Sequence, residues 1–158
     1  MRVTDGVVLR KRYTLSVRFV REIRLVGQNE RQRTASLSGE VKDYDEGTWR
    51  RVECTLTLRA HGLDCRKSAT DFFEAFCKIR TELEKEGVFP LCYGASWNVY
   101  PSAMGRDMAL GLKAYRIRKG HVAMLEDLVE IFDSGADVQV ATVEEQRRYW
   151  REWMGGAD

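Results

Sequence analysis

Proline is scarce in this sequence, with two residues among 158. This scarcity excludes a proline-rich linker between domains, and the longest stretch without clear periodicity is short. A chain near 150 residues ordinarily folds around a single hydrophobic core. We therefore predict one domain that spans residues 1–158 without an internal boundary.

Long apolar runs are also missing. No run approaches the ~18 residues that a membrane span needs, and residues 1–6 lack the basic-then-apolar pattern of a signal peptide. The four cysteines are 11, 12 and 15 positions apart, which matches no CxxC zinc or redox pattern. We expect reduced, structural cysteines in a cytoplasmic protein that does not bind a membrane.

Sequence patterns that hold metals or cofactors are also missing. His61 and His121 are the only histidines, and neither belongs to a Cys/His cluster of the kind that binds zinc. The glycines Gly94, Gly105 and Gly111 follow neither the GxGxxG pattern nor the P-loop pattern of phosphate-binding sites. We therefore predict no metal site and no cofactor.

Signs of nucleophilic catalysis are equally few. Cys92, Ser96 and Ser102 lie in an irregular segment, but their surroundings resemble neither a nucleophile elbow nor a papain-type cysteine. We predict that the protein is not an enzyme. The alternative is a small enzyme or ligand-binding domain with its site in residues 92–115, which requires Asn98, Ser102 and Arg106 to converge with a histidine.

The charges balance overall but not locally. The chain has 26 Lys and Arg against 24 Asp and Glu, a net charge of +2. Residues 1–33 hold nine basic and three acidic side chains, whereas residues 120–158 hold three basic and nine acidic ones. On a strand, the basic part would suit a phosphate-binding stripe, formed by Arg10, Arg12, Arg18 and Arg24. Because no nucleic-acid motif is present, we favour a solvated sheet face and keep nucleic-acid binding as an alternative.

Period-2 alternation predicts strands in the first part of the chain. One strand covers residues 13–25, and its expected buried face is Tyr13, Leu15, Val17, Phe19, Ile23 and Leu25. Val20 and Arg21 invert the alternation, which indicates a bulge. Further strands are expected at 33–41 and 52–60. Three consecutive strands with short turns make an antiparallel meander.

A helical period follows. An apolar stripe predicts an amphipathic helix over residues 69–86, with Ser68 and Asp71 resembling a capping box and Gly87 ending the helix. Shorter strands are expected within 91–100 and 112–118, and at 129–132 after a helical turn. Thr142 and Glu145 form a capping box for a last helix, whose aromatic face should dock on the sheet. The predicted fold is α+β, with a mainly antiparallel sheet, two principal helices and the order βββα–ββ(β)–α.

The segment Pro90–Tyr115, PLCYGASWNVYPSAMGRDMALGLKAY, resembles a known family, as do Leu128–Asp133 and Thr142–Gln146 with the aromatic helix behind them. The most specific part is Tyr100-Pro-Ser-Ala-Met104 together with Met108, Gly111 and Tyr115. The family consists of small bacterial cytosolic proteins found with secreted polymorphic toxins, in which small α+β immunity proteins neutralise a toxin domain. The resemblance covers about residues 90–153 and implies a cytosolic inhibitor that binds a toxin directly.

The expected site is therefore a surface for a protein partner. If the toxin acts on nucleic acid and is basic, the acidic residues near the C-terminus would complement it. The irregular segment Asn98–Met108 is the second candidate. The predicted partner-binding residues are Glu126, Asp127, Glu130, Asp133, Asp137, Asn98, Tyr100 and Arg106.

Overall fold

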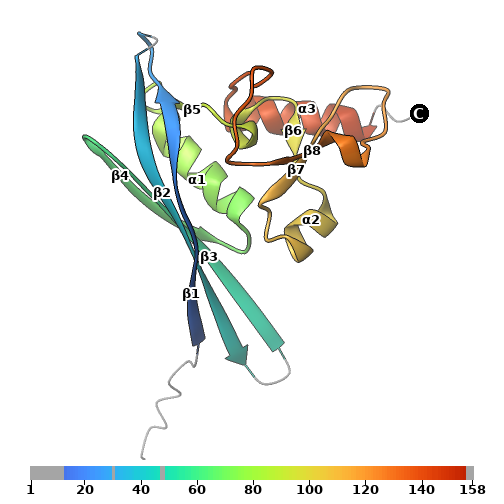
Figure 1. Cartoon of the computed structure of the whole chain (residues 1–158). Coiled ribbons are helices and arrows are strands. Elements are labelled where there is room, and N and C mark those ends of the chain that lie inside the picture. Colours follow the sequence, from blue (N-terminus) through green and yellow to red (C-terminus); the bar gives the residue numbers. More distant parts are fainter. Residues whose placement is uncertain (1–12, 30, 47–48, 156–158) are drawn as a thin grey trace, which may run out of the picture.

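Four consecutive strands make most of the larger sheet. The computed structural model describes residues 13–29, 31–46 and 49–155 (Figure 1). The strands are β1 (Tyr13–Val26), β2 (Gln32–Glu46), β3 (Trp49–Ala60) and β4 (Leu63–Ala69). Each pairs antiparallel with the next. The short β5 (Phe89–Pro90) pairs with the end of β1, so the order across the sheet is β4-β3-β2-β1-β5.

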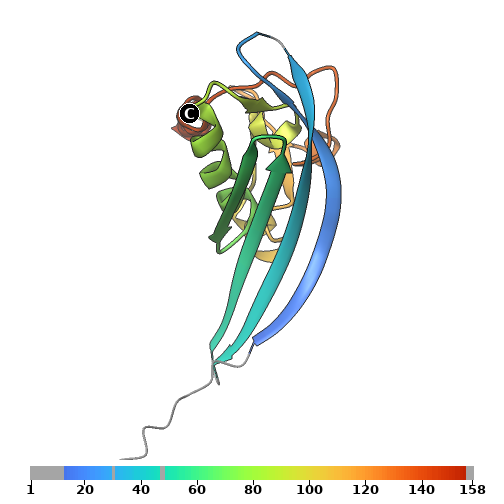
Figure 2. The ribbon, with the colours of Figure 1, turned by 90° about the vertical axis from the view of Figure 1, so that its left-hand side faces the viewer.

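Helix α1 (Phe72–Glu84) covers the inner face of this curved sheet, as two perpendicular views show (Figures 1 and 2). The alternation predicted for β2 and β3 is confirmed, because the apolar parity of each strand is buried against the helix. These strand residues are Ala35, Leu37, Val41, Cys54, Leu56 and Leu58. In β3, Thr55 and Thr57 are buried as well. The helix contributes buried residues that include Phe72, Phe73, Phe76 and Ile79. Burying this apolar area is the main source of stability of the fold.

The buried face predicted for β1 is wrong for its first three apolar residues. Tyr13, Leu15 and Val17 are 51%, 51% and 64% exposed. Val17 pairs with Glu40 and Phe19 pairs with Gly39, so a β-bulge at Arg18 shifts the register. The bulge lies before the predicted position at Val20 and Arg21, and it changes which parity of the strand faces the core.

Strand β4 is missing from the predicted order, and it moves the start of the helix. Ser68 belongs to β4 and does not cap α1. The N-cap is Asp71, whose carboxylate accepts a 2.8 Å hydrogen bond from the N–H of Glu74. Gly87 follows the helix with φ +67°, a conformation that glycine adopts without strain.

The rest of the chain forms a smaller sheet and a helix. The sheet has the order β6 (Val99–Tyr100), β7 (Lys113–Arg116) and β8 (Leu128–Glu130), all antiparallel. The predicted helical turn before the last strand is a 3-10 turn at Leu125–Asp127. The unpredicted α2 (Ala103–Met108) connects β6 and β7. Helix α3 (Val143–Gly155) begins as predicted, with the N–H of Glu145 bonded to Thr142 Oγ1 at 3.1 Å.

One hydrophobic core joins the two sheets. Phe132, just after β8, packs its ring 5.4 Å from the ring of Phe19 on β1 and 5.0 Å from that of Phe76 on α1. The α+β class, the mainly antiparallel sheet and the two principal helices are confirmed. Among the described residues, no helix has both the length and the apolar character to span a membrane.

Candidate functional site

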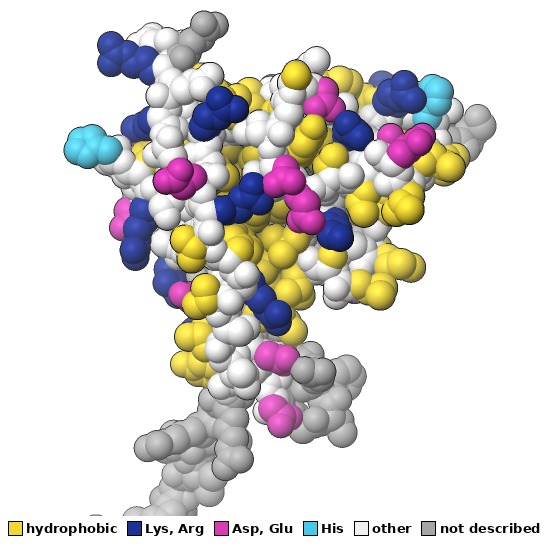
Figure 3. Space-filling view, in the orientation of Figure 1, with side chains coloured by type: hydrophobic (Ala, Val, Ile, Leu, Met, Phe, Trp, Pro, Cys, Tyr) yellow, Lys and Arg dark blue, Asp and Glu magenta, His cyan; other side chains and the backbone are white. Residues whose placement is uncertain are grey.

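An apolar groove of about 500 Å³ lies between α2, α3 and the smaller sheet. We call it the α2–α3 groove. Its lining consists of Tyr100, Pro101, Ser102, Ala103, Met104, Tyr115, Ile117, Val122, Ala123, Trp150, Trp153 and Met154. Apolar side chains are exposed over this part of the molecule, around α2 and the end of α3 (Figure 3). Exposed apolar concavities of this kind mark binding surfaces more often than single exposed residues do.

Aromatic contacts fix the α3 wall of the groove. Trp150 stacks on Tyr100 with 4.5 Å between ring centroids and 14° between ring planes. Tyr100 in turn meets the buried Phe73 edge-on, at 5.1 Å between ring centroids. Trp153 donates a 3.0 Å hydrogen bond from Nε1 to the carbonyl of His121. Both tryptophans are half-buried, so their free faces are presented by a rigid frame.

The α2 wall is shaped by its two ends. Ser102 caps the helix through a 2.9 Å hydrogen bond from the N–H of Gly105. Leu110 and Gly111 end it with φ values of +53° and +73°. A Cβ on Gly111 would lie 2.8 Å from Asp71 Oδ1, so only glycine lets this turn approach α1 so closely. Met104 faces the groove and is 69% exposed.

Ion pairs hold α2 and α3 against α1. Arg106 Nη1 lies 3.3 Å from Asp71 and 3.6 Å from Glu74, and its Nη2 bonds to the hydroxyl of Tyr100 at 3.3 Å. Arg147 reaches Glu74 from α3 at 3.1 Å. Burial raises the pKa of Tyr100, so its hydroxyl stays protonated at neutral pH. Arg106, which is predicted to bind a partner, therefore contacts three residues of its own chain and holds α2 in place.

The predicted acidic surface is largely neutralised within the chain. Asp133 pairs with Arg21 at 2.8 Å, Asp137 with Arg116 at 3.1 Å and Glu130 with Lys113 at 4.0 Å. Hydrogen bonds from the hydroxyl of Tyr93 and from Arg116 lower the pKa of Asp137. Basic and acidic side chains alternate across the face in Figure 3 without separating into two regions.

The remaining predicted residues lie in different places. Asp127 accepts a 2.9 Å hydrogen bond from the N–H of Met124, while Glu126 is exposed. Both line a smaller pocket of about 210 Å³ that shares Val122 and Ala123 with the α2–α3 groove. Asn98 is half-buried and accepts a hydrogen bond from Ser96 Oγ at 2.9 Å. Of the predicted partner-binding residues, Tyr100 lines the groove itself.

The alternative site in residues 92–115 gains no support from these contacts. Ser102 is engaged in capping α2, and Arg106 is paired with Asp71. His61 lies at the turn between β3 and β4. His121 is exposed and lines the smaller pocket beside the groove, where its carbonyl accepts the hydrogen bond from Trp153. Among the described residues, no three His, Cys, Asp or Glu side chains are grouped so that they could hold a metal ion.

The basic stripe predicted on the first strand is only partly described. Arg10 and Arg12 lie outside the described residues. Arg24 is exposed on β1, opposite Thr34 of β2. Arg21, which is not part of the predicted stripe, turns to the inner side of the sheet and pairs with Asp133. Arg18 occupies the bulge.

The groove itself was not predicted. The sequence predicts an aromatic face on the last helix, and the expected role of that face is packing on the sheet. In the structure, the buried residues of α3 are Val143 and Gln146, and the two tryptophans beyond them stay partly open. The sequence feature that could have indicated the groove is a set of methionines that are exposed in the structure, Met104, Met108 and Met154.

The chain matches no known protein-family model, and a comparison with curated protein sequences gives no match.

Proposed function

We propose that this chain is a protein-binding domain whose partner occupies the α2–α3 groove. The observation that carries the proposal is the lining, in which two half-buried tryptophans and two tyrosines lie beside the exposed Met104 and Met154. Tryptophan and tyrosine dominate the binding energy of many protein interfaces. Methionine adapts its shape to an incoming apolar side chain.

We propose further that the partner is a secreted bacterial toxin and that the chain is its cytoplasmic inhibitor. The resemblance to immunity proteins supports this role, because its most specific residues coincide with the groove. Tyr100, Pro101, Ser102, Ala103, Met104 and Tyr115 belong both to that motif and to the lining.

Inhibition would follow from direct binding. An apolar segment of the toxin would fill the groove, and the surrounding surface would block the toxin's active site or hold the toxin inactive. Glu126 and Asp127 lie beside the groove, together with Arg116 and Arg118, and their carboxylates would contact basic side chains of the toxin. Rim charges mainly accelerate association, whereas the buried aromatic contacts set the lifetime of the complex.

The test uses two methionines on the same short helix. Met104 lines the groove, whereas Met108, at 80% exposed, does not. With a toxin domain as probe, chosen by looking for a toxin gene next to the gene of this chain, Met104→Glu should weaken binding by at least about tenfold in calorimetry. Met108→Glu should bind like the unmodified chain.

Two results separate the parts of the proposal. If the two methionine variants bind the toxin equally well, the groove is not part of the interface. If the unmodified chain does not bind the toxin, or does not protect cells that express it, the chain is not an inhibitor of that toxin.

A further inference from the structure

Strand β4 forms one edge of the larger sheet, and no strand of the described residues pairs with its outer side. The turn His61–Gly62 joins it to β3, with Ala60 opposite Leu63. The residues that close such a two-residue hairpin exchange both of their backbone hydrogen bonds. Odd-numbered residues of β4 therefore bond to β3, and Asp64, Arg66 and Ser68 direct their N–H and C=O groups outward.

Two side-chain contacts agree with this assignment. Lys78 of α1 donates a 2.8 Å hydrogen bond to the carbonyl of Ser68, which must then face away from β3. The hydroxyl oxygens of Thr55 and Ser68 lie 2.6 Å apart, as suits a non-hydrogen-bonded pair, in which side chains approach most closely. Among the described residues, the outward N–H and C=O groups of Asp64 and Arg66 have no backbone partner.

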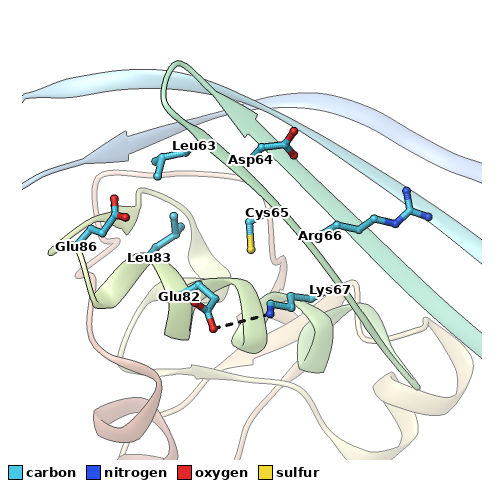
Figure 4. A pocket seen from close by; sticks show the side chains of 8 residues that line it. All are labelled: Leu63, Asp64, Cys65, Arg66, Lys67, Glu82, Leu83 and Glu86. Carbon is cyan, nitrogen blue, oxygen red and sulfur yellow. Dashed lines mark ion pairs between the residues drawn. The ribbon is translucent and has the colours of Figure 1, made fainter.

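A polar groove of about 380 Å³ runs between this free edge and α1 (Figure 4). Its lining comprises Leu63, Asp64, Cys65, Arg66, Lys67, Glu82, Leu83 and Glu86. Lys67 pairs with Glu82 at 3.8 Å at one end. Glu86 lies at the other end, near Leu63, and has no ion-pair partner among the described residues. Asp64 and Arg66 point away from the groove on the other face of the strand (Figure 4). Within the chain, Asp64 lies 3.9 Å from Arg59 and Arg66 lies 3.5 Å from Glu40, and both Asp64 and Arg66 stay more than half exposed.

We propose that β4 pairs antiparallel with β4 of a second copy of this chain, about a two-fold axis at Cys65. This inference does not depend on the toxin-inhibitor role. The register follows from charge. Centring the axis on Asp64 or Arg66 places that residue opposite itself, and centring it on Lys67 sets two lysines face to face. The axis at Cys65 instead places Asp64 opposite Arg66 twice, which is the favourable arrangement for cross-strand pairs.

The same register satisfies the other groups along the edge. Asp64 and Arg66 of the second copy exchange backbone hydrogen bonds, which uses all the free groups of both residues. Leu63 faces Lys67 of the second copy, which brings that lysine toward the unpaired Glu86. Charged residues on an edge strand normally prevent pairing, but here the alternating signs make the edge complementary to itself.

Cysteine crosslinking tests the position of the axis. Cys65 would face Cys65 of the second copy in a non-hydrogen-bonded pair, with Cβ atoms about 5 Å apart. It is half-buried, whereas Cys54, Cys77 and Cys92 are buried. A short bis-maleimide added to the full-length chain should therefore yield a covalent dimer. Cys65→Ser should abolish that product.

Charge reversal tests the register. Asp64→Arg and Arg66→Asp each place like charges opposite each other twice, so each variant should raise the dimer dissociation constant by at least about tenfold in sedimentation equilibrium. An equimolar mixture of the two variants restores opposite charges and should form a heterodimer. Glu22→Arg, an exposed charge reversal on β1, is the matched control and should leave association unchanged.

Circular dichroism establishes that both variants fold before they are mixed. A wild-type chain that sediments as a monomer at all concentrations overturns the proposal. So does a mixture of folded variants that remains monomeric, or a crosslinked dimer that persists in Cys65→Ser. If a strictly monomeric chain binds the toxin, the dimer proposal is wrong but the proposed function as a toxin inhibitor is unaffected.

Discussion

Arg80 of α1 donates a 2.6 Å hydrogen bond to the side-chain oxygen of Gln146 of α3, and both residues are fully buried. Arg80 also donates to the carbonyls of Gly94 and Ala141, at 3.1 and 2.9 Å. The amide nitrogen of Gln146 lies 2.9 Å from each of the carbonyls of Gly94, Ser96 and Val99. This pair therefore satisfies the backbone of the loops that connect α1, the smaller sheet and α3.

Replacing Arg80 by methionine keeps much of the side-chain volume but removes the donors. The carbonyl of Ala141 and the side-chain oxygen of Gln146 would lose buried partners, at about 1–3 kcal/mol each. We expect Arg80→Met to lower the free energy of unfolding by about 2 kcal/mol or more, measured by urea denaturation. Arg148→Met, at an exposed position of α3, should change it by less than about 0.5 kcal/mol. Equal stabilities of the two variants would refute a structural role of the buried pair.

Gly39 is required by the ring of Phe19 on the neighbouring strand. A Cβ at this position would lie within van der Waals overlap of Phe19 Cε1 and Cζ. The ring cannot move freely, because it packs between Phe72 and Phe132. Gly39→Ala should therefore cost about 1–3 kcal/mol of stability. Gly27 has open space around its Cβ position, so Gly27→Ala is the matched control; a melting temperature lowered equally in both would contradict this account.

Asp71 has two roles that one pair of variants can separate. Its carboxylate caps α1 through the N–H of Glu74 and pairs with Arg106. Asparagine caps a helix about as well as aspartate but carries no charge. Asp71→Ala should therefore cost about 1 kcal/mol more than Asp71→Asn, measured as the free energy of unfolding. If asparagine and alanine cost the same, the cap contributes nothing.

Alkaline pH should destabilise the fold through its buried thiols. Burial raises the pKa of Cys54 to about 12 and the pKa values of Cys77 and Cys92 to about 11. Because these pKa values are higher in the folded state, the stabilisation is complete below the pKa of the unfolded thiols, about 8.5. It is lost as the pH rises toward the folded values.

Each buried thiol should then remove about 1.4 kcal/mol of stability per pH unit within that window. Urea titrations between pH 8 and about pH 10.5 measure the slope. Cys92→Ala removes one of the three groups and should make the slope shallower. An unchanged slope in this variant would assign the alkaline loss to other residues.

Periodicity was a sufficient guide where strands and helix pack directly on each other. The parities of β2 and β3 and the stripe of α1 followed from the sequence because the central residues of those faces are buried. Strand β4 escaped prediction because Lys67, at an edge, occupies a position of apolar parity and reaches Glu82 with its ammonium group. Helix α2 escaped because it has six residues and contains Gly105.

The candidate groove could not be predicted for a related reason. A period shows which residues share a face but not whether another element covers that face. Trp150 and Trp153 share the apolar side of α3 with Val143. Only the structure shows that Val143 is buried by neighbouring elements whereas the two tryptophans are partly exposed. The pairing of Asp133 with Arg21 likewise depends on a contact across 112 positions, which the charge gradient alone could not reveal.

The order of elements in the larger sheet bears on how the chain folds during translation. Strands β2, β3 and β4 each pair with the strand synthesised just before, and α1 then packs on β3 and β4. Such local contacts form quickly, and synthesis proceeds from the N-terminus. We expect the meander and α1 to assemble on the ribosome while the end of β1 near Leu25 waits for β5 to emerge. The ribosome-bound intermediate would thus have both edges of its sheet open at once, which makes this brief stage the one most exposed to aggregation.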